Sequence, residues 1–295
     1  MADTPRRLAA ERRLPVVVPP PTAPGALDGP DPARRGDVDH WGRSQRFRDV
    51  TNRFFMGPMY RRWFRAEWEG LEHIPRAGGA LLVANHAGAV PSDDPVIVYG
   101  IEQEVGRPLY SLADQIFPSV PFLGLVQNRF GGVNAHPDNA YRLLREEQQL
   151  AIVFPEGTKG TGKPWRQRYK LQRFGRGGFV EIAMRAGVPV VPIAVMGAEE
   201  AMPMVTRMPW LARAVGVPYA PVTANMLVFG PLLGTFMWFP AKFRLRVLPP
   251  VHFDVAPDQE RYSKARVLEE SEAIRQRIQD AVDDLLAHRK SVWFG

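Results

Sequence analysis

The chain has 295 residues, of which 45% are hydrophobic and 23% are charged, so it is long enough for one large or two small globular domains. It has no cysteine, which excludes a disulfide framework, a thiol nucleophile and a cysteine metal site, and its six scattered histidines argue against zinc. The formal net charge of +7 favours anionic partners such as a phospholipid surface, a phosphorylated substrate or a nucleic acid.

Residues 1–38 are predicted to form a disordered tail. They are rich in proline and arginine, include the run Pro19-Pro20-Pro21, and show neither a helical nor a strand period. The apolar run Val16-Val17-Val18 is too short for the core of a signal peptide. No export signal is therefore expected.

Residues 39–70 are predicted to form a basic amphipathic segment. Aromatic side chains recur there at roughly helical spacing, and arginines lie between them. This pattern is typical of a helix in the membrane interface, although a helix that packs its apolar stripe on the core would show a similar stripe. Gly57-Pro58 is expected to break the helix into two pieces.

The stretch from Ala80 to Asp94 contains the first candidate for chemistry. The apolar run from Ala80 to Ala84 predicts a buried strand, and His86 follows directly after it. Asp93 and Asp94 come after a turn, where a following helix would begin. A histidine at the carboxyl end of a core strand, with a carboxylate nearby, is suited to general-base catalysis. A histidine that is merely hydrogen-bonded in the core, beside a capped helix, is the alternative.

The rest of the chain alternates strands with helices, which predicts an α/β fold. Strands are expected near residues 109–113, 150–154, 188–195 and 243–247, and helices near 139–149, 179–186 and 267–286. Residues 214–241 form a stretch of 28 residues without charge, but its prolines and glycines exclude a helix that spans a bilayer. This stretch is expected to be either core or a segment that contacts a membrane.

A second motif, Phe154-Pro155-Glu156-Gly157-Thr158-Lys159-Gly160, follows the strand at 150–154. Its glycines, hydroxyl and cation are suited to holding a phosphate, and a basic run with interleaved aromatic residues comes next. The residues from Gly157 to Lys163 match the start of a P-loop, but Pro164 stands where the magnesium-binding Ser or Thr would be. Nucleotide hydrolysis is therefore not expected, and no recognisable nucleic-acid module surrounds the basic run.

Taken together, Asn85-His86 with a downstream Asp, the Phe154–Thr158 block and Val191-Pro192-Ile193 resemble the glycerolipid acyltransferase family, which includes the PlsC-like lysophospholipid acyltransferases. The resemblance covers about residues 70–250. It implies an α/β fold with a mixed sheet flanked by helices, in which residues 71–255 form the catalytic domain. The interfacial segment would precede this domain, and a C-terminal amphipathic helix would occupy residues 256–295.

The resemblance also implies a membrane-associated enzyme that moves a fatty acyl group from a thioester to a glycerolipid hydroxyl. Because no export signal is expected and the N-terminal segment is predicted to be interfacial, the protein is expected to be peripheral on the cytoplasmic face of the cell membrane. The thioester would be acyl-CoA or an acyl carrier protein, and neither a cofactor nor a metal would be needed. By this analogy His86 is the base and Asp93 its partner. The substrate-binding residues would be Asn85, Glu156, Gly157, Thr158, Lys159, Lys163 and Arg168.

Two features depart from the family pattern. The family places Asp after His and four further residues, but position 91 is Pro; Asp93 is preferred as the partner because Asp94 is better placed as a helix cap. The block at 131–136 lacks the arginine that would meet an acceptor phosphate. A lysophosphatidate-type acceptor is favoured, with Lys159, Lys163 or Arg168 on its phosphate. Diacylglycerol or another neutral lipid is the alternative acceptor, and an acyl thioesterase or a non-catalytic lipid-binding protein the alternative function.

Overall fold

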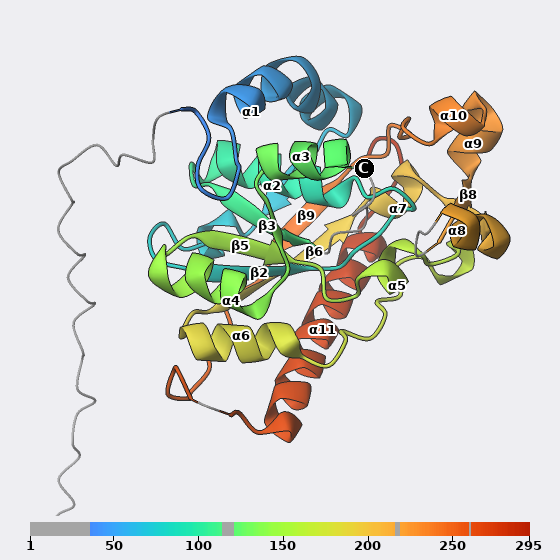
Figure 1. Cartoon of the computed structure of the whole chain (residues 1–295). Helices are drawn as coiled ribbons and strands as arrows, with labels where there is room; N and C mark the ends of the chain where they lie inside the picture. Colours follow the sequence, from blue (N-terminus) through green and yellow to red (C-terminus); the bar gives the residue numbers. More distant parts are fainter. Residues whose placement is uncertain (1–35, 114–120, 216–218, 260) are drawn as a thin grey trace, which may run out of the picture.

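A computed structural model describes residues 36–113, 121–215, 219–259 and 261–295, so the predicted tail lies almost wholly outside the described residues. A seven-stranded mixed sheet in the order β1-β9-β6-β2-β5-β3-β4 forms the centre (Figure 1). All neighbouring strands are parallel except β6 and β9. The strands are β1 (Glu67–Glu69), β2 (Ala80–Ala84), β3 (Leu109–Ala113), β4 (Gly132–Asn134), β5 (Leu150–Val153), β6 (Val190–Met196) and β9 (Arg244–Val247).

Helices cover both faces of the sheet, with α1, α2 and α3 on one side and α4, α6 and α11 on the other (Figure 1). The described helices are α1 (Gln45–Thr51), α2 (Asp93–Glu104), α3 (Pro121–Arg129), α4 (Pro137–Tyr141), α5 (Thr158–Thr161), α6 (Gly178–Ala186), α7 (Ala198–Ala201), α8 (Pro209–Val215), α9 (Ala224–Phe229), α10 (Pro231–Gly234) and α11 (Lys264–Ala287). Strands that alternate with helices thus form the mixed sheet flanked by helices that the sequence predicts.

The central strand β2 is buried along its whole length, because it is covered on both faces. Alternate residues enter two different cores, with Leu82 in the core beneath α2 and Leu81 in the core beneath α6 and α11. Ile274 and Ile278 of α11 are also buried in this second core. The predicted C-terminal helix is therefore an integral part of the α/β layer structure.

The N-terminal helix does not break at Gly57-Pro58, and the sequence prediction is wrong on this point. Both residues have helical φ angles, −62° and −58°, and they lie between π-helical turns at Asn52–Met56 and Met59–Trp63. The Gly57 N–H bonds to Asn52 O, five residues back, so the hydrogen-bond register has widened just before the proline. A wider turn accommodates a residue that has no N–H to donate.

Residues 203–240 form an insertion between β6 and β9. It contains a small antiparallel sheet, β7 (Met204–Arg207) with β8 (Pro221–Thr223), followed by α9 and α10. Several of its apolar side chains are exposed, so most of the uncharged stretch is not core. Among the described residues, no helix is both long enough and apolar enough to cross a membrane.

Candidate active site

His86 and Asp93 meet at the carboxyl end of β2. His86 follows the strand after Asn85, and Asp93 is the first residue of α2, with 2.9 Å between His86 Nδ1 and Asp93 Oδ2. The Asp93 carboxylate is fully buried and also accepts the backbone N–H groups of Ala87 and Asp94, each at 2.8 Å. Because this carboxylate can only accept, the hydrogen of the neutral imidazole lies on Nδ1. Nε2 is left as an acceptor, and within the described residues it forms no hydrogen bond.

The environment of His86 tunes it as a base. Its side chain is 15% exposed, and its ring stacks on Phe154 with 4.3 Å between centroids. Burial lowers the pKa of His86, but the charge of Asp93 and the hydrogen bond to it outweigh burial and raise the pKa above its ordinary value of 6.5. The imidazolium form is therefore stabilised, as a group that must accept a proton requires.

Asp94 does not cap α2, contrary to the sequence prediction. Its Oδ1 accepts a 2.5 Å hydrogen bond from Ser111 Oγ in the middle of β3. Burial raises the pKa of Asp94 to about 6. Ser92 occupies the cap position, but its hydroxyl caps no N–H and is buried with no partner among the described residues. A buried hydroxyl is poorly placed to act as a nucleophile.

Asn85 ties two strands together and does not face a ligand. Its Nδ2 donates to Val195 O at 2.9 Å, and its Oδ1 accepts from Val195 N at 2.8 Å. The side chain is buried, with both polar ends engaged in this link from β2 to β6. The predicted role of Asn85 in substrate binding is therefore at odds with its contacts, and Asn85 instead fixes the backbone that carries His86.

Glu156 and Lys163 are likewise buried and engaged with protein groups, contrary to their predicted contact with substrate. Glu156 accepts the backbone N–H of His86 at 2.9 Å and that of Gln172 at 2.6 Å. The Lys163 ammonium, whose side chain is 1% exposed, lies 3.0 Å from Glu199 and 3.5 Å from Glu156. These buried charges form an ion-pair cluster, and its member Glu156 holds the backbone of His86 in place by accepting the His86 N–H.

The loop from Gly157 to Lys163 packs directly on His86. A Cβ at Gly160 would lie 2.6 Å from His86 O, so only glycine permits this close approach. The backbone N–H groups of Gly157, Lys159 and Gly160 bond within the loop, so they do not form the predicted phosphate cradle. Thr158 and Lys159 are exposed, and Arg168 is exposed with its guanidinium 4.5 Å from the Trp165 ring centroid.

Two residues near this loop carried no sequence signal. Arg207 of β7 donates to Gly162 O, and Tyr219 contacts both Ala89 O at 2.9 Å and Thr161 Oγ1 at 2.6 Å. They reach the site from the 203–240 insertion, more than forty residues beyond the loop in sequence. Only the fold brings them together, so neither spacing nor composition could have indicated them.

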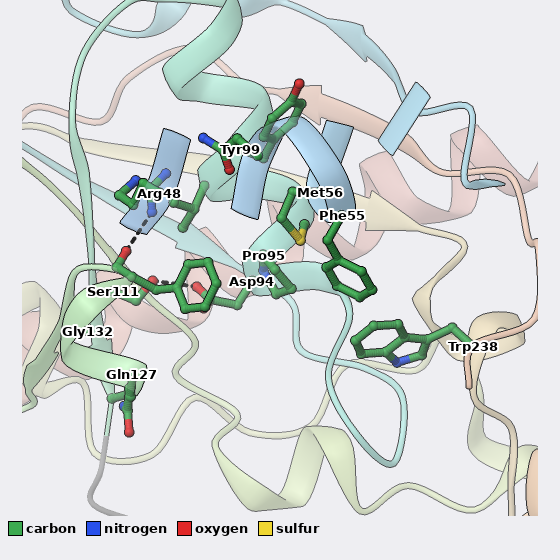
Figure 2. A pocket seen from close by; sticks show the side chains of 14 residues that line it. Arg48, Phe55, Met56, Asp94, Pro95, Tyr99, Ser111, Gln127, Gly132 and Trp238 are labelled. Atoms are coloured by element: carbon green, nitrogen blue, oxygen red, sulfur yellow. Dashed lines mark hydrogen bonds between the residues drawn. The ribbon is translucent and has the colours of Figure 1, made fainter. Parts of the chain in front are cut away.

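An apolar cavity lies next to the His86–Asp93 pair (the dyad) and has Asp94 in its wall. Its volume, about 310 Å³, is in the size range of small-molecule sites. Phe55 and Trp238 lie at one end, and Arg48, Asp94 and Ser111 at the other (Figure 2). Arg48 is itself buried and paired with Glu102. Asp94, next to Asp93 in the chain, thus links the cavity wall to the dyad. Within the described residues, no group of three or more His, Asp or Glu side chains is arranged to hold a metal ion.

The fold and the site define an α/β protein with a His–Asp pair at the carboxyl edge of a mixed sheet, beside an apolar cavity. The family model described as Acyltransferase matches residues 65–196, which include β2, the His–Asp pair and the Phe154–Thr158 block. The chain belongs to this acyltransferase family.

Its relatives support the same family. An uncharacterized protein of Mycobacterium tuberculosis is 36% identical over 260 residues, covering 88% of this chain and 72% of that protein. The human protein named "DGAT1/2-independent enzyme synthesizing storage lipids" is 27% identical over 195 residues, 65% of this chain and 55% of that protein. The crystal structure of PlsC, a 1-acyl-sn-glycerophosphate acyltransferase from Thermotoga maritima, shares the fold, with a TM-score of 0.50 and 19% identity over 83% of this chain and 85% of that one.

Proposed function

We propose that the protein transfers a fatty acyl group from an acyl thioester to a hydroxyl of a glycerolipid, with His86 as the general base. The observation that carries this proposal is the 2.9 Å contact between His86 Nδ1 and the buried Asp93, which leaves Nε2 free to accept a proton. The neighbour of Asp93 in the chain, Asp94, lines an apolar cavity. The family and the lipid-synthesising relative support the same class of reaction.

The chemistry is a direct transfer. His86 Nε2 takes the proton of the acceptor hydroxyl while that oxygen attacks the thioester carbonyl, and Asp93 stabilises the imidazolium that forms. The carbon–sulfur bond then breaks, and the leaving thiolate takes the proton from the imidazolium. Base assistance of this kind contributes ~10²–10⁴-fold. The burial of Ser92 favours this route over an acyl-serine intermediate.

The cavity beside the dyad is suited to the acyl chain. Its wall is largely apolar and includes Phe55, Met56, Val98 and Trp238. Burial of methylene groups there would contribute ~0.8 kcal/mol for each CH₂. Acyl-CoA and an acyl carrier protein both present such a chain through the same thioester, so either carrier fits the proposal.

For the acceptor we favour a lysophosphatidate-type lipid. Lys159 is exposed on the loop that packs against His86, Arg168 is exposed five residues after the end of this loop, and Arg207 donates to Gly162 O of the loop. Lys163 is excluded from this role by its burial between carboxylates. A neutral acceptor such as diacylglycerol is the second candidate, because the 131–136 block has no arginine and a similar protein is named for storage-lipid synthesis.

We further propose that the protein is peripheral on a membrane, on the cytoplasmic face. The N-terminal helix supports this, because Tyr60 and Phe64 fix its inner side to the core while Phe54, Arg53 and Arg61 are exposed on its outer side. Exposed aromatic and basic side chains together are typical of a helix at a membrane interface.

The test is an acyl-transfer assay with labelled long-chain acyl-CoA and, in a parallel series, an acyl carrier protein donor. Lysophosphatidate, diacylglycerol and no acceptor are offered side by side. Wild type should yield a glycerolipid product, and His86→Ala should lower the rate by ~10²–10⁴-fold. His288→Ala, at an exposed histidine just after α11, should retain full activity. A product that forms equally with His86→Ala would refute the base assignment. Free fatty acid without an acceptor would indicate a thioesterase, and lipid binding with no turnover at all a binding protein.

A further inference from the structure

The hairpin formed by α9 and α10 carries an exposed apolar tip. Leu227, Val228, Leu232, Leu233 and Phe236 are 55–81% exposed. The hairpin projects from the edge of the molecule, beyond the helices that cover the sheet (Figure 1). We propose that this hairpin inserts into the interface of an anionic phospholipid bilayer, as a second membrane contact separate from the N-terminal helix.

The base of the hairpin is built to hold the tip outward. Asn225 is fully buried and donates to Ala201 O at 3.0 Å and to Met237 O at 2.7 Å, which fixes both ends of the hairpin to the body. Thr223 caps α9 by accepting the Met226 N–H at 3.2 Å. A Cβ at Gly234 would lie 2.4 Å from Asn225 O, so the two segments of the hairpin are in close contact. Polar groups are thus buried at the base while leucines are exposed at the tip, the reverse of an ordinary surface loop.

The charge distribution around the hairpin selects the partner. Residues 214–241 contain no charged side chain, so nothing in the tip opposes burial among acyl chains. The exposed arginines Arg207 and Arg213 precede this stretch, and the outer side of the N-terminal helix carries Arg53, Arg61 and Arg62. An uncharged apolar tip, preceded by exposed arginines in the same insertion, matches a bilayer whose headgroups are anionic.

The hairpin is also coupled to the apolar cavity. Trp238 follows α10 and lines the same end of the cavity as Phe55 (Figure 2). Its indole N–H donates to Val90 O at 3.0 Å. The Trp63 indole in turn donates to Trp238 O at 3.0 Å, which joins the N-terminal helix to the end of the hairpin. Insertion of the tip would therefore bring the Phe55–Trp238 end of the cavity to the bilayer surface. This consequence, unlike insertion itself, rests on the proposed function.

The first test uses a site-specific probe, which the absence of native cysteine makes possible. Leu232→Cys is labelled with an environment-sensitive dye in the full-length chain, and Leu268→Cys, at an exposed leucine of α11, is the matched control. Vesicles of phosphatidylglycerol and phosphatidylcholine should shift the emission to the blue at position 232 and not at position 268. An unchanged emission at 232 would overturn the proposal, and an equal shift with pure phosphatidylcholine would overturn its electrostatic part.

The second test measures vesicle partitioning in flotation experiments. The double variant Leu232→Glu/Leu233→Glu should weaken partitioning by at least ~10-fold for each leucine, whereas Leu268→Glu should not change it. Equal partitioning of all three proteins would overturn the proposal. Self-association would also overturn the proposal, because a second copy of the chain would then cover the hairpin. Its signs are a blue shift at position 232 without vesicles, an increase of this shift with protein concentration, and a doubled molecular mass.

Both tests need no substrate, so they are independent of the proposed chemistry. Acyl transfer between a water-soluble short-chain donor and a water-soluble acceptor is measured on wild type in parallel. If that transfer is absent while the hairpin inserts, the proposed function fails and the membrane contact remains. If transfer occurs while the hairpin stays outside the bilayer, the proposed membrane contact fails and the proposed function remains.

Discussion

At the scale of single residues, the His86–Asp93 pair makes activity depend on pH in a defined direction. The Asp93 charge helps to raise the pKa of His86 above 6.5, and only the neutral imidazole can accept a proton. We therefore expect kcat/KM to rise with pH through this pKa and to level off above it. In Asp93→Asn the rising limb should move to lower pH, because the charge that favours the imidazolium is gone.

The plateau of Asp93→Asn should also fall, by ~10²–10⁴-fold, because the ring loses its fixed tautomer and the support of its charged form. The measurement is a profile of kcat/KM against pH for both proteins with one acceptor. A limb that stays in place when Asp93 is neutralised would mean that another group titrates in this range.

The carboxyl group of Asp94 should lower the free energy of unfolding at neutral pH. Its pKa is raised from 3.8 to about 6, chiefly by burial, so the folded protein holds this proton more tightly than the unfolded chain does. Stability is then lost as pH rises from about 4 to above 6. Asp94→Asn keeps an acceptor for Ser111 and removes the charge, so it should gain up to ~3 kcal/mol at pH 7 and nothing below pH 4. Denaturant unfolding at the two pH values measures this difference, and an equal effect at both would contradict it.

At the scale of elements, the loop that follows β5 carries two lysines in different environments. Lys163 is buried and ion-paired, whereas Lys159 is exposed. Lys163 is the cation paired with both Glu156 and Glu199, so Lys163→Met would leave these two buried carboxylates without it. Loss of one member of a buried pair destabilises by ~3–5 kcal/mol, which would lower the melting temperature markedly. Lys159→Met, four residues earlier and exposed, should leave stability within ~0.5 kcal/mol and raise KM for a phosphorylated acceptor only. A fully stable Lys163→Met protein would contradict the ion-pair assignment.

The elements also show which parts of the fold can be predicted from local sequence patterns. Ala80–Ala84 and Leu109–Ala113 are strands over the predicted residues, because an apolar run bounded by turn residues suits a strand that is covered on both faces. Strand β1 carried no such pattern, since its three residues depend on pairing with β9, about 175 residues away. The family resemblance likewise assigned Asn85, Glu156 and Lys163 to the substrate site. It could not show which protein groups they contact, because their partners Val195, Gln172 and Glu199 come from other elements.

At the scale of the whole molecule, the N-terminal helix serves the core and the surface at once. Arg48 pairs with Glu102 inside the protein, and Tyr60 and Phe64 are buried, so deletion of this helix would disrupt the fold. The membrane contact proposed for this helix must instead be tested through its outer side. Arg53, Arg61 and Arg62 are exposed there. Helix α1, at the start of this segment, lies on the opposite side of the sheet from α11 (Figure 1).

We expect Arg53→Glu/Arg61→Glu/Arg62→Glu to weaken binding to phosphatidylglycerol-containing vesicles by at least ~100-fold at low ionic strength, because each basic side chain near an anionic surface contributes ~1 kcal/mol. The effect should shrink as salt rises, since the Debye length falls to ~8 Å at 0.15 M. The control, Arg261→Glu/Lys264→Glu/Arg266→Glu, makes the same change in net charge at and before the start of α11. If both triple variants lose binding equally, net charge alone drives the association. If only the first does, the bilayer lies on the side of the N-terminal helix, which contributes Phe55 to the wall of the cavity.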